Sequence, residues 1–228
     1  MYIRGIMDHL AYFKDRIAKQ GGCYFDDYMQ MVLYDPSYGY YSTHTDIKRD
    51  FVTAPMLSMW FGRSFAHDWI CNHSQLLKQG VFEWGSGRGD LMLSIMTWLY
   101  EQNQLPDRYV CVEPSPTLRA LTERRLEGLP SDISRRVKIC ETFDQEIKGI
   151  LINNELLDAM PCKRFVWSHD ILKEQSVEVV NGELAFATQA PSAVLQHFFS
   201  KIDQPLVSPY CSEIQPIAVD WFQDKLDR

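Results

Sequence analysis

The feature that most constrains the fold is a glycine loop that directly follows a short apolar segment. Residues 81–84 read Val-Phe-Glu-Trp, and residues 85–89 place a glycine at every second position. The next residues carry Leu91, Ile95 and Leu99 at helical spacing. A strand, a glycine turn and a helix form half of a βαβ unit. Because glycine allows sharp turns and close backbone approach, the loop also predicts a ligand site.

The alternation of strand and helix continues after this loop. We expect strands at 109–113, 137–140 and 149–153, which are short and apolar. Between the first two lies a helix in which Ser115 is the expected N-cap and Pro116 the first helical residue. The pattern predicts an α/β fold with a parallel sheet.

The segments on either side of this region differ from it in the spacing of their apolar residues. Helices are expected at 8–20, 26–33 and 58–78, near 195–202 and from 216. Asn181-Gly182 lies between two β-rich runs and predicts a hairpin. We therefore expect a helical N-terminal extension over residues 1–79 and a Rossmann-like domain over residues 80–228, with a β-hairpin insertion at 163–188.

Composition narrows the class of protein. The 228 residues are 46% hydrophobic with a net charge of −7, and long basic runs are absent, which argues against a nucleic-acid partner. No apolar stretch is long enough to span a membrane. Six cysteines are scattered without a Cys-x-x-Cys pair, as expected for reduced thiols in a cytoplasmic protein. His67 and Cys71 share one helix face, but no second ligand pair accompanies them, so no metal is expected.

The loop spacing indicates which kind of cofactor fits. It is neither the Gly-x-Gly-x-x-Gly pattern of dinucleotide sites nor a P-loop, and Asp90 directly after it would repel a pyrophosphate. Glu113, at the end of the second strand, is placed to accept hydrogen bonds from a ribose diol. These features favour a nucleoside cofactor without phosphates over a nicotinamide cofactor. The alternative is a tight turn with a solvated carboxylate.

Residues 83–89 resemble motif I of class I S-adenosylmethionine (SAM) methyltransferases. Three further segments add to the resemblance: 33–36 with 39–41, 50–55 with Ser58 and 61–62, and 154–161. Together, from about residue 24 to 228, they are similar to the MidA-like methyltransferases. That family includes the mitochondrial complex I assembly factor with protein arginine methyltransferase activity. The resemblance implies a Rossmann-like class I SAM methyltransferase sheet with SAM as cofactor.

The resemblance also implies site residues. For the cofactor they are Glu83, Gly85, Ser86, Gly87, Gly89, Glu113, Pro114, Glu141, Thr142, Asn154 and Thr53. Glu155 and Asp158 are the implied catalytic residues, because paired carboxylates suit a guanidinium acceptor. The alternatives are a solvated loop acid at Glu141, a structural turn at Thr53, and a capped helical turn for Glu155 and Asp158.

The chain departs from the family pattern at two places. Arg49 stands where the family usually has glycine. The family continues well beyond the position equivalent to Arg228, so the sheet here is expected to be incomplete, with the fourth strand as an apolar edge. We therefore expect a protein acceptor and, for the exposed edge, either a homodimer through it or a chain that is less stable than one containing the missing strands. A catalytically impaired SAM-binding assembly factor is the alternative function.

Overall fold

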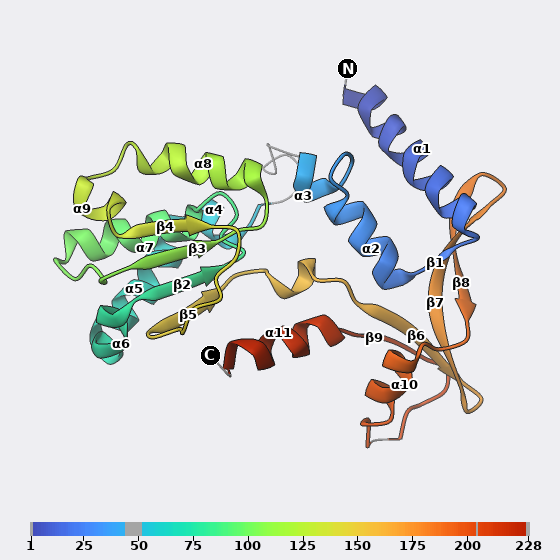
Figure 1. Ribbon diagram of the computed structural model, residues 1–228. Coiled ribbons are helices and arrows are strands. Elements are labelled where there is room, and N and C mark those ends of the chain that lie inside the picture. The colour runs from blue at the N-terminus through green and yellow to red at the C-terminus, as the bar shows by residue number, and fades with distance from the viewer. Residues whose placement is uncertain (1, 44–51, 204, 227–228) are drawn as a thin grey trace. The chain divides into compact units, whose positions relative to one another are not determined.

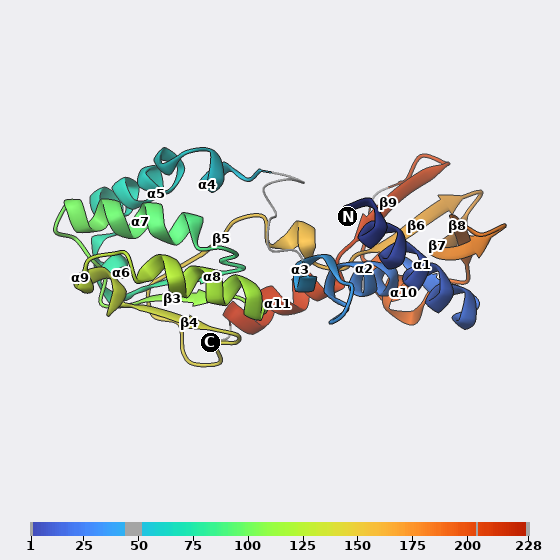
Figure 2. The same cartoon turned by 90° about the horizontal axis from the view of Figure 1, so that it is seen from above.

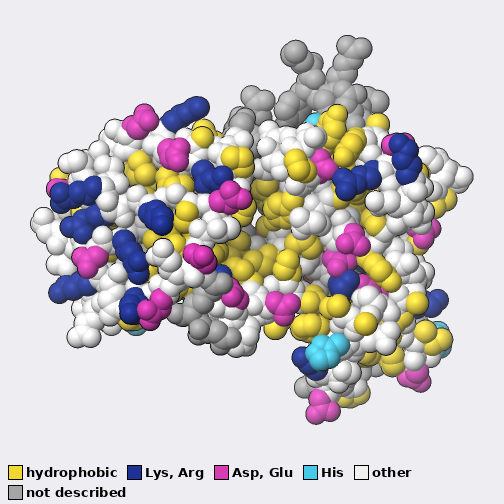
Figure 3. All heavy atoms as spheres, viewed as in Figure 1, with side chains coloured by type: hydrophobic (Ala, Val, Ile, Leu, Met, Phe, Trp, Pro, Cys, Tyr) yellow, Lys and Arg dark blue, Asp and Glu magenta, His cyan; other side chains and the backbone are white. Residues whose placement is uncertain are grey.

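The computed structural model describes residues 2–43, 52–203 and 205–226, which form two compact units. Unit 1 contains the chain up to residue 41 together with residues from 157 onward, and unit 2 contains residues 42–156 (Figure 1). Among the described residues, none of the helices is long and apolar enough to cross a membrane. Both acidic and basic side chains lie on the face shown in Figure 3.

Unit 2 contains a parallel four-stranded sheet. Its strands are β2 (Val81–Trp84), β3 (Tyr109–Val112), β4 (Val137–Cys140) and β5 (Ile150–Asn153), in the order β4-β3-β2-β5. All three pairings are parallel. Each strand lies where the sequence predicts it, and the Rossmann-like α/β class is confirmed.

Helices α7 (Asp90–Glu101) and α8 (Pro116–Leu126) connect β2 to β3 and β3 to β4. Both crossovers step in the same direction along the sheet, so right-handed connections place both helices on one face (Figure 2). The predicted N-cap is confirmed, since Ser115 Oγ accepts a hydrogen bond from the backbone N–H of Leu118. The short helix α9 (Ser131–Ser134) precedes β4.

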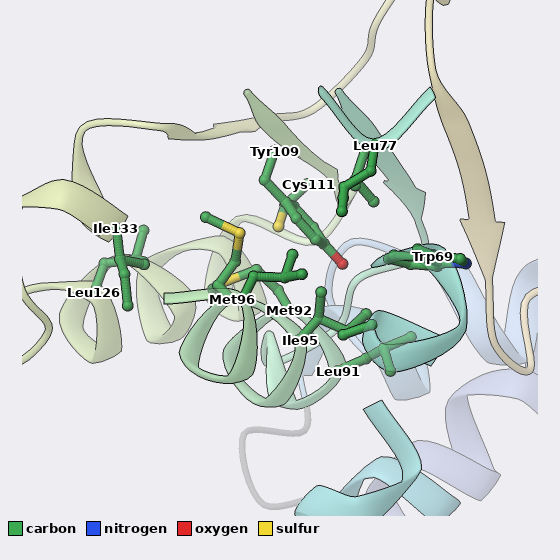
Figure 4. Close-up of a cluster of buried hydrophobic side chains, with 13 residues drawn as sticks. Trp69, Leu77, Leu91, Met92, Ile95, Met96, Tyr109, Cys111, Leu126 and Ile133 are labelled. Atoms are coloured by element: carbon green, nitrogen blue, oxygen red, sulfur yellow. The ribbon is translucent and has the colours of Figure 1, made fainter. Parts of the chain in front are cut away.

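The core of unit 2 lies between these helices and the sheet. Tyr109 and Cys111 of β3 point into it, where they meet Met92, Ile95 and other apolar side chains of α7 (Figure 4). Helix α5 (Met59–Asn72) also packs on α7. Any side chain at Gly62 would collide with Ser94, which explains the glycine at this helix contact.

The segment before the sheet differs from its prediction. The expected single helix at 58–78 is two helices, α5 and α6 (Ser74–Gln79), because His73 between them leaves the helical conformation. α4 (Ala54–Leu57) precedes them, and α3 (Tyr40–Thr43) lies at the unit boundary. α5 and α6 contribute Trp69 and Leu77 to the core that packs on the parallel sheet. They therefore belong to the same unit as the sheet, and the boundary expected at residue 79 is not a boundary between the compact units.

Unit 1 contains a second, antiparallel sheet. Its strands are β1 (Cys23–Tyr24), β6 (Lys163–Ser168), β7 (Ile171–Val180), β8 (Glu183–Gln189) and β9 (Tyr210–Ile214). The predicted hairpin is confirmed, with positive φ at both Asn181 and Gly182 between β7 and β8. It is not an isolated insertion, because β1 pairs with β7 and β9 pairs with β6.

The remaining elements of unit 1 are helical. They are α1 (Tyr2–Gln20), α2 (Phe25–Tyr34), the 3₁₀ turn η2 (Leu157–Ala159), α10 (Ala193–Phe199) and α11 (Pro216–Leu226). Phe13 and Ile17 of α1, Met31 of α2 and Val177 of β7 form its buried cluster. Lys163 forms ion pairs with Asp26 at 2.7 Å and with the fully buried Glu174 at 2.9 Å.

Candidate functional site

The glycine loop follows β2 at the carboxyl end of the parallel sheet, where α/β proteins bind their ligands. Gly85, Gly87 and Gly89 all have positive φ angles, of 68°, 56° and 74°. Side chains rarely adopt this conformation, so the three glycines are required by the turn itself. Gly89 is the N-cap of α7.

The surroundings of the three glycines differ. A side chain at Gly85 would press against Leu156, and one at Gly89 would press against Thr122. At Gly87 nothing lies within 4 Å of the place that a Cβ would take. The loop is therefore packed against the protein at both ends and faces open space at its centre, as a cradle for a ligand requires.

Glu113 follows β3 and holds the centre of the loop. Its Oε2 accepts the backbone N–H of Gly87 at 2.9 Å, and its Oε1 accepts that of Ser115 at 2.8 Å. The side chain is buried. Burial raises the pKa of Glu113, while the two N–H groups and nearby Arg119 oppose that rise. Each carboxylate oxygen has a second lone pair, so a ribose diol could still be accepted.

Glu83 lies beneath the loop rather than on its surface. Its carboxyl group is buried on β2 and accepts a 2.6 Å hydrogen bond from the Tyr109 hydroxyl. Burial raises the pKa of Glu83 to about 8, with additional repulsion from Glu113 and Asp90. Glu83 is therefore mostly protonated at neutral pH.

Ser86 supplies a buried hydroxyl that makes few hydrogen bonds within the protein. Its Oγ is buried and, among the described residues, has no nitrogen or oxygen partner; the thiol of Cys111 is nearby. Buried hydroxyls normally have a hydrogen-bond partner. Together with the open space at Gly87, this hydroxyl fits a site for a polar small molecule.

Arg119 of α8 is a site residue that the sequence reasoning missed. Its Nη1 donates to the carbonyl oxygens of Glu113 at 2.6 Å and Pro114 at 2.7 Å, and its Nη2 lies 3.4 Å from Glu141 Oε2. Arg119 thus links three predicted cofactor residues. The sequence signal is a row of polar residues every third position along α8, at Arg119, Thr122 and Arg125.

The segment after β4 carries Glu141 and Thr142, both exposed. The next residue, Phe143, is buried and packs against Phe82 and Trp84 of β2. The structure therefore anchors this segment to the sheet through Phe143 and leaves both predicted residues accessible beside it.

The segment after β5 is split between the two units. Asn154 and Glu155 belong to unit 2, where the neighbouring Leu156 contacts Gly85. Asp158 belongs to unit 1, in η2. Glu155 is exposed with a φ of 52°, a conformation that is uncommon outside glycine and often found at functional sites. The structure therefore brings Asn154 and Glu155 to the loop side of unit 2.

Thr53 is the N-cap of α4, and its carbonyl oxygen accepts the N–H of Met56 at 3.0 Å. α4 packs on α7, the helix that follows the glycine loop. The rest of this family segment, residues 49–51, lies outside the described residues. His67 Nε2 and Cys71 Sγ lie 3.8 Å apart, and no group of three possible metal ligands occurs in the described part of the chain.

Residues 62–227 match the family model described as "Putative S-adenosyl-L-methionine-dependent methyltransferase". The chain belongs to this family. The match covers the glycine loop, the parallel sheet and the second sheet from β6 onward, so the resemblance inferred from the four motifs is confirmed.

Several relatives resemble the chain. A mitochondrial protein arginine methyltransferase, NDUFAF7 of Rattus norvegicus, is 33% identical over 101 residues, which is 42% of this chain and 22% of the rat protein. Its Caenorhabditis elegans homologue is 27% identical over 207 residues, covering 78% of this chain and 48% of the nematode protein. The chain thus spans less than half the length of these relatives.

A solved structure covers more of the chain. A Burkholderia thailandensis protein crystallised with S-adenosyl-homocysteine superimposes with a TM-score of 0.80 at 27% identity, covering 97% of this chain and 59% of that one. A native crystal structure of a Burkholderia thailandensis protein gives the same TM-score and identity. These likenesses extend over both units of the present chain.

Proposed function

We propose that the chain binds SAM in the glycine loop and takes part in methyl transfer. The observation that carries the proposal is the buried Glu113 carboxylate, which holds the N–H of Gly87 where the loop faces open space. The bound S-adenosyl-homocysteine of the Burkholderia thailandensis relative supports it. SAM carries its methyl group on a positively charged sulfonium, and the neutral thioether that remains after transfer is a good leaving group.

The protein's contribution is to bind and orient. Gly85 and Gly89 allow the turn, and Gly87 leaves room for the cofactor to approach the backbone. Ser86 offers a buried hydroxyl, and Glu113 accepts hydrogen bonds from the ribose. Pro114, Glu141 and Thr142 line the adjoining side, and Asn154 and Thr53 complete the proposed cofactor set. Glu83 precedes the loop on β2, and its buried carboxyl group is hydrogen-bonded to Tyr109 rather than exposed to the cofactor.

We further propose a protein arginine side chain as the acceptor, with Glu155 as the residue that binds it and Asp158 as a second candidate. The names of the rat and nematode relatives support this acceptor class. Glu155 is exposed, directly follows β5 and has an uncommon backbone conformation. Holding the guanidinium in line with the methyl group would be most of the catalysis.

Calorimetric titration with S-adenosyl-homocysteine tests the cofactor site. Glu113→Ala should weaken affinity at least about tenfold, because hydrogen bonds to a charged group contribute roughly 1.5–3 kcal/mol each. Glu123→Ala, an exposed change on α8, is the matched control. Equal affinity in wild type and Glu113→Ala would show that Glu113 does not serve the ribose. Parallel titration with NAD separates this proposal from an oxidoreductase.

Methyl transfer to an arginine-containing peptide tests the acceptor role. Glu155→Gln keeps the shape and removes the charge, so turnover should fall while affinity for SAM stays unchanged. If Glu155→Gln loses both turnover and affinity for SAM, Glu155 belongs to the cofactor site. If it keeps full turnover, Glu155 has no role in catalysis. A wild-type chain that binds SAM without turnover would favour the alternative, an assembly factor that acts by contact.

We also propose self-association through β5. This strand is half-buried and pairs with β2, and among the described residues no strand pairs with its other side. An open edge of this kind can accept another strand. Light scattering should therefore detect a dimer, and replacing Leu151 with Pro on that strand should remove it. A monodisperse monomer would contradict the proposal.

The cytoplasm is the compartment we propose. All six cysteines are free thiols, which suits a reducing environment. The rat and nematode relatives are named as mitochondrial, so imaging of a fluorescent fusion in the source cells would separate the two compartments.

A further inference from the structure

The face of α8 that meets the glycine loop carries two polar side chains that bind the loop's backbone. Thr122 and Arg125 lie three residues apart and therefore share a helix face. Thr122 Oγ1 lies 3.2 Å from the carbonyl oxygen of Gly87, and Arg125 Nη1 donates to that of Arg88 at 2.8 Å. Two successive loop carbonyls are thus bound by one helix face.

Arg125 makes a second contact at the end of the loop. Its Nη2 lies 2.8 Å from Oδ1 of Asp90, the first residue of α7. The planar guanidinium therefore binds the loop backbone and the start of the next helix at the same time. Lysine has a single ammonium group and cannot reproduce this fork.

Thr122 acts through both of its branches. Its hydroxyl is shared between the carbonyl oxygens of Gly87 and Leu118, the latter at 3.1 Å. Its methyl group lies against Gly89, where a side chain would collide with it. The side chain is fully buried, so its position relative to the loop is well defined.

A loop with three glycines needs such contacts. Glycine has more accessible backbone conformations than other residues, and fixing them opposes ligand binding unless the free protein already holds them. Glu113 fixes the N–H of Gly87 from the β3 side, while α8 fixes the carbonyl of the same residue and that of the next one. Gly87 is therefore held on both sides of its Cα, through its own N–H and its own carbonyl oxygen.

We propose that Thr122 and Arg125 are positioning residues that hold the glycine loop in its cofactor-binding conformation before the cofactor arrives. The inference rests on the proposed SAM site. It assigns a part of the affinity to a helix face whose side chains need not touch the cofactor. Loss of either side chain should loosen residues 86–90 and weaken cofactor binding without unfolding unit 2.

A purely structural role makes a different prediction. If these side chains only stabilised the fold, a variant that remains folded would bind as the wild type does, because affinity falls only in proportion to the competent fraction. If they position the loop, affinity falls although the folded fraction stays close to one. The melting temperature and the dissociation constant together separate the two cases.

The test compares Arg125→Gln and Arg125→Lys with Arg124→Gln and Arg124→Lys. Arg124 neighbours Arg125 on α8 but is exposed, and among the described residues its side chain makes no hydrogen bond or ion pair. The charge changes are therefore matched. Thr122→Val keeps the shape without the hydroxyl, and Thr122→Ser keeps the hydroxyl without the methyl group.

Two measurements are made on the full chain. Amide hydrogen exchange without cofactor should become about tenfold faster in residues 86–90 of Arg125→Gln. Calorimetry with S-adenosyl-homocysteine should show about tenfold weaker binding, the size of one lost charge-assisted hydrogen bond. Arg125→Lys should lie between Arg125→Gln and wild type, Thr122→Ser should stay closer to wild type than Thr122→Val, and both Arg124 variants should match wild type.

The outcomes are distinguishable. Unchanged exchange in the loop of Arg125→Gln would show that Arg125 does not hold the loop. Faster exchange with unchanged affinity would show that holding the loop does not contribute to cofactor binding. If the Arg124 variants lost as much affinity as the Arg125 variants, the loss would come from the change in net charge, and the proposal would be wrong. A wild-type chain that binds no S-adenosyl-homocysteine would refute the proposed function, and with it the role of Thr122 and Arg125 in cofactor binding, even if the exchange data show that they hold the loop.

Discussion

The buried acid beneath the glycine loop predicts an unusual dependence of stability on pH. In Glu83→Gln the amide keeps the size of the side chain, and its carbonyl oxygen can still accept the 2.6 Å bond from the Tyr109 hydroxyl. The amide cannot ionise. Any part of the pH dependence that comes from Glu83 therefore disappears in this variant.

The magnitude follows from the pKa of Glu83, which burial raises from an ordinary 4.5 to about 8. Between these values the folded chain binds a proton that the unfolded chain has released, so the free energy of unfolding falls as pH rises. The slope is about 1.4 kcal/mol per pH unit, and over the window of roughly 3.5 units it sums to about 5 kcal/mol. This contribution to stability is fully present below pH ~4.5 and is lost as pH rises through ~8.

Urea unfolding of both proteins at several pH values measures this directly. The difference in unfolding free energy, Glu83→Gln minus wild type, should grow by about 1.4 kcal/mol per pH unit between pH ~5 and ~8 and then level off. Glu123→Gln, an exposed carboxylate on α8, should follow wild type at every pH. Tyr109→Phe removes a bond to the charged form, so it should raise the pKa of Glu83 and move the window upward. A difference that does not change with pH would mean that Glu83 titrates normally, and the reasoning from burial would be wrong.

Other predictions follow from the same contacts. Gly89→Ala should both destabilise unit 2 and abolish binding of S-adenosyl-homocysteine, because its Cβ would press on Thr122 at a positive φ; thermal melts and calorimetry would check this. Gly87→Val should abolish binding, because its side chain would enter the open space that the cofactor needs, and should also lower the melting temperature, because a β-branched residue is strained at a φ of 56°; unchanged affinity for S-adenosyl-homocysteine would contradict this. Lys163→Met should lower the unfolding free energy by about 3–5 kcal/mol, because it leaves the charge of buried Glu174 without its partner, whereas Lys163→Arg should lose less; unchanged urea midpoints would refute the assignment.

Local sequence was sufficient for the strands and the turn chemistry of this chain. The four parallel strands are short apolar runs that are bounded by glycine, proline or polar residues, and each lies where its pattern predicts. The positive φ angles of the glycine loop and of Asn181-Gly182 follow from the same local rules, because few other residues adopt them readily. The N-cap hydrogen bond of Ser115 joins residues only three positions apart, so local sequence is enough to predict it.

Contacts between distant residues were decided only by the tertiary structure. Strands β1 and β9 are short and weakly patterned, and they become strands because β7 and β6 offer them hydrogen bonds across the sheet. The roles of Arg119, Thr122 and Arg125 depend on how α8 lies over the loop, which no local pattern states. The sequence alone determined that a carboxylate would follow β3. That Glu113 binds the loop itself, and that Glu83 is buried deeply enough to keep its proton, depends on burial and geometry that exist only once the sheet and its helices have packed.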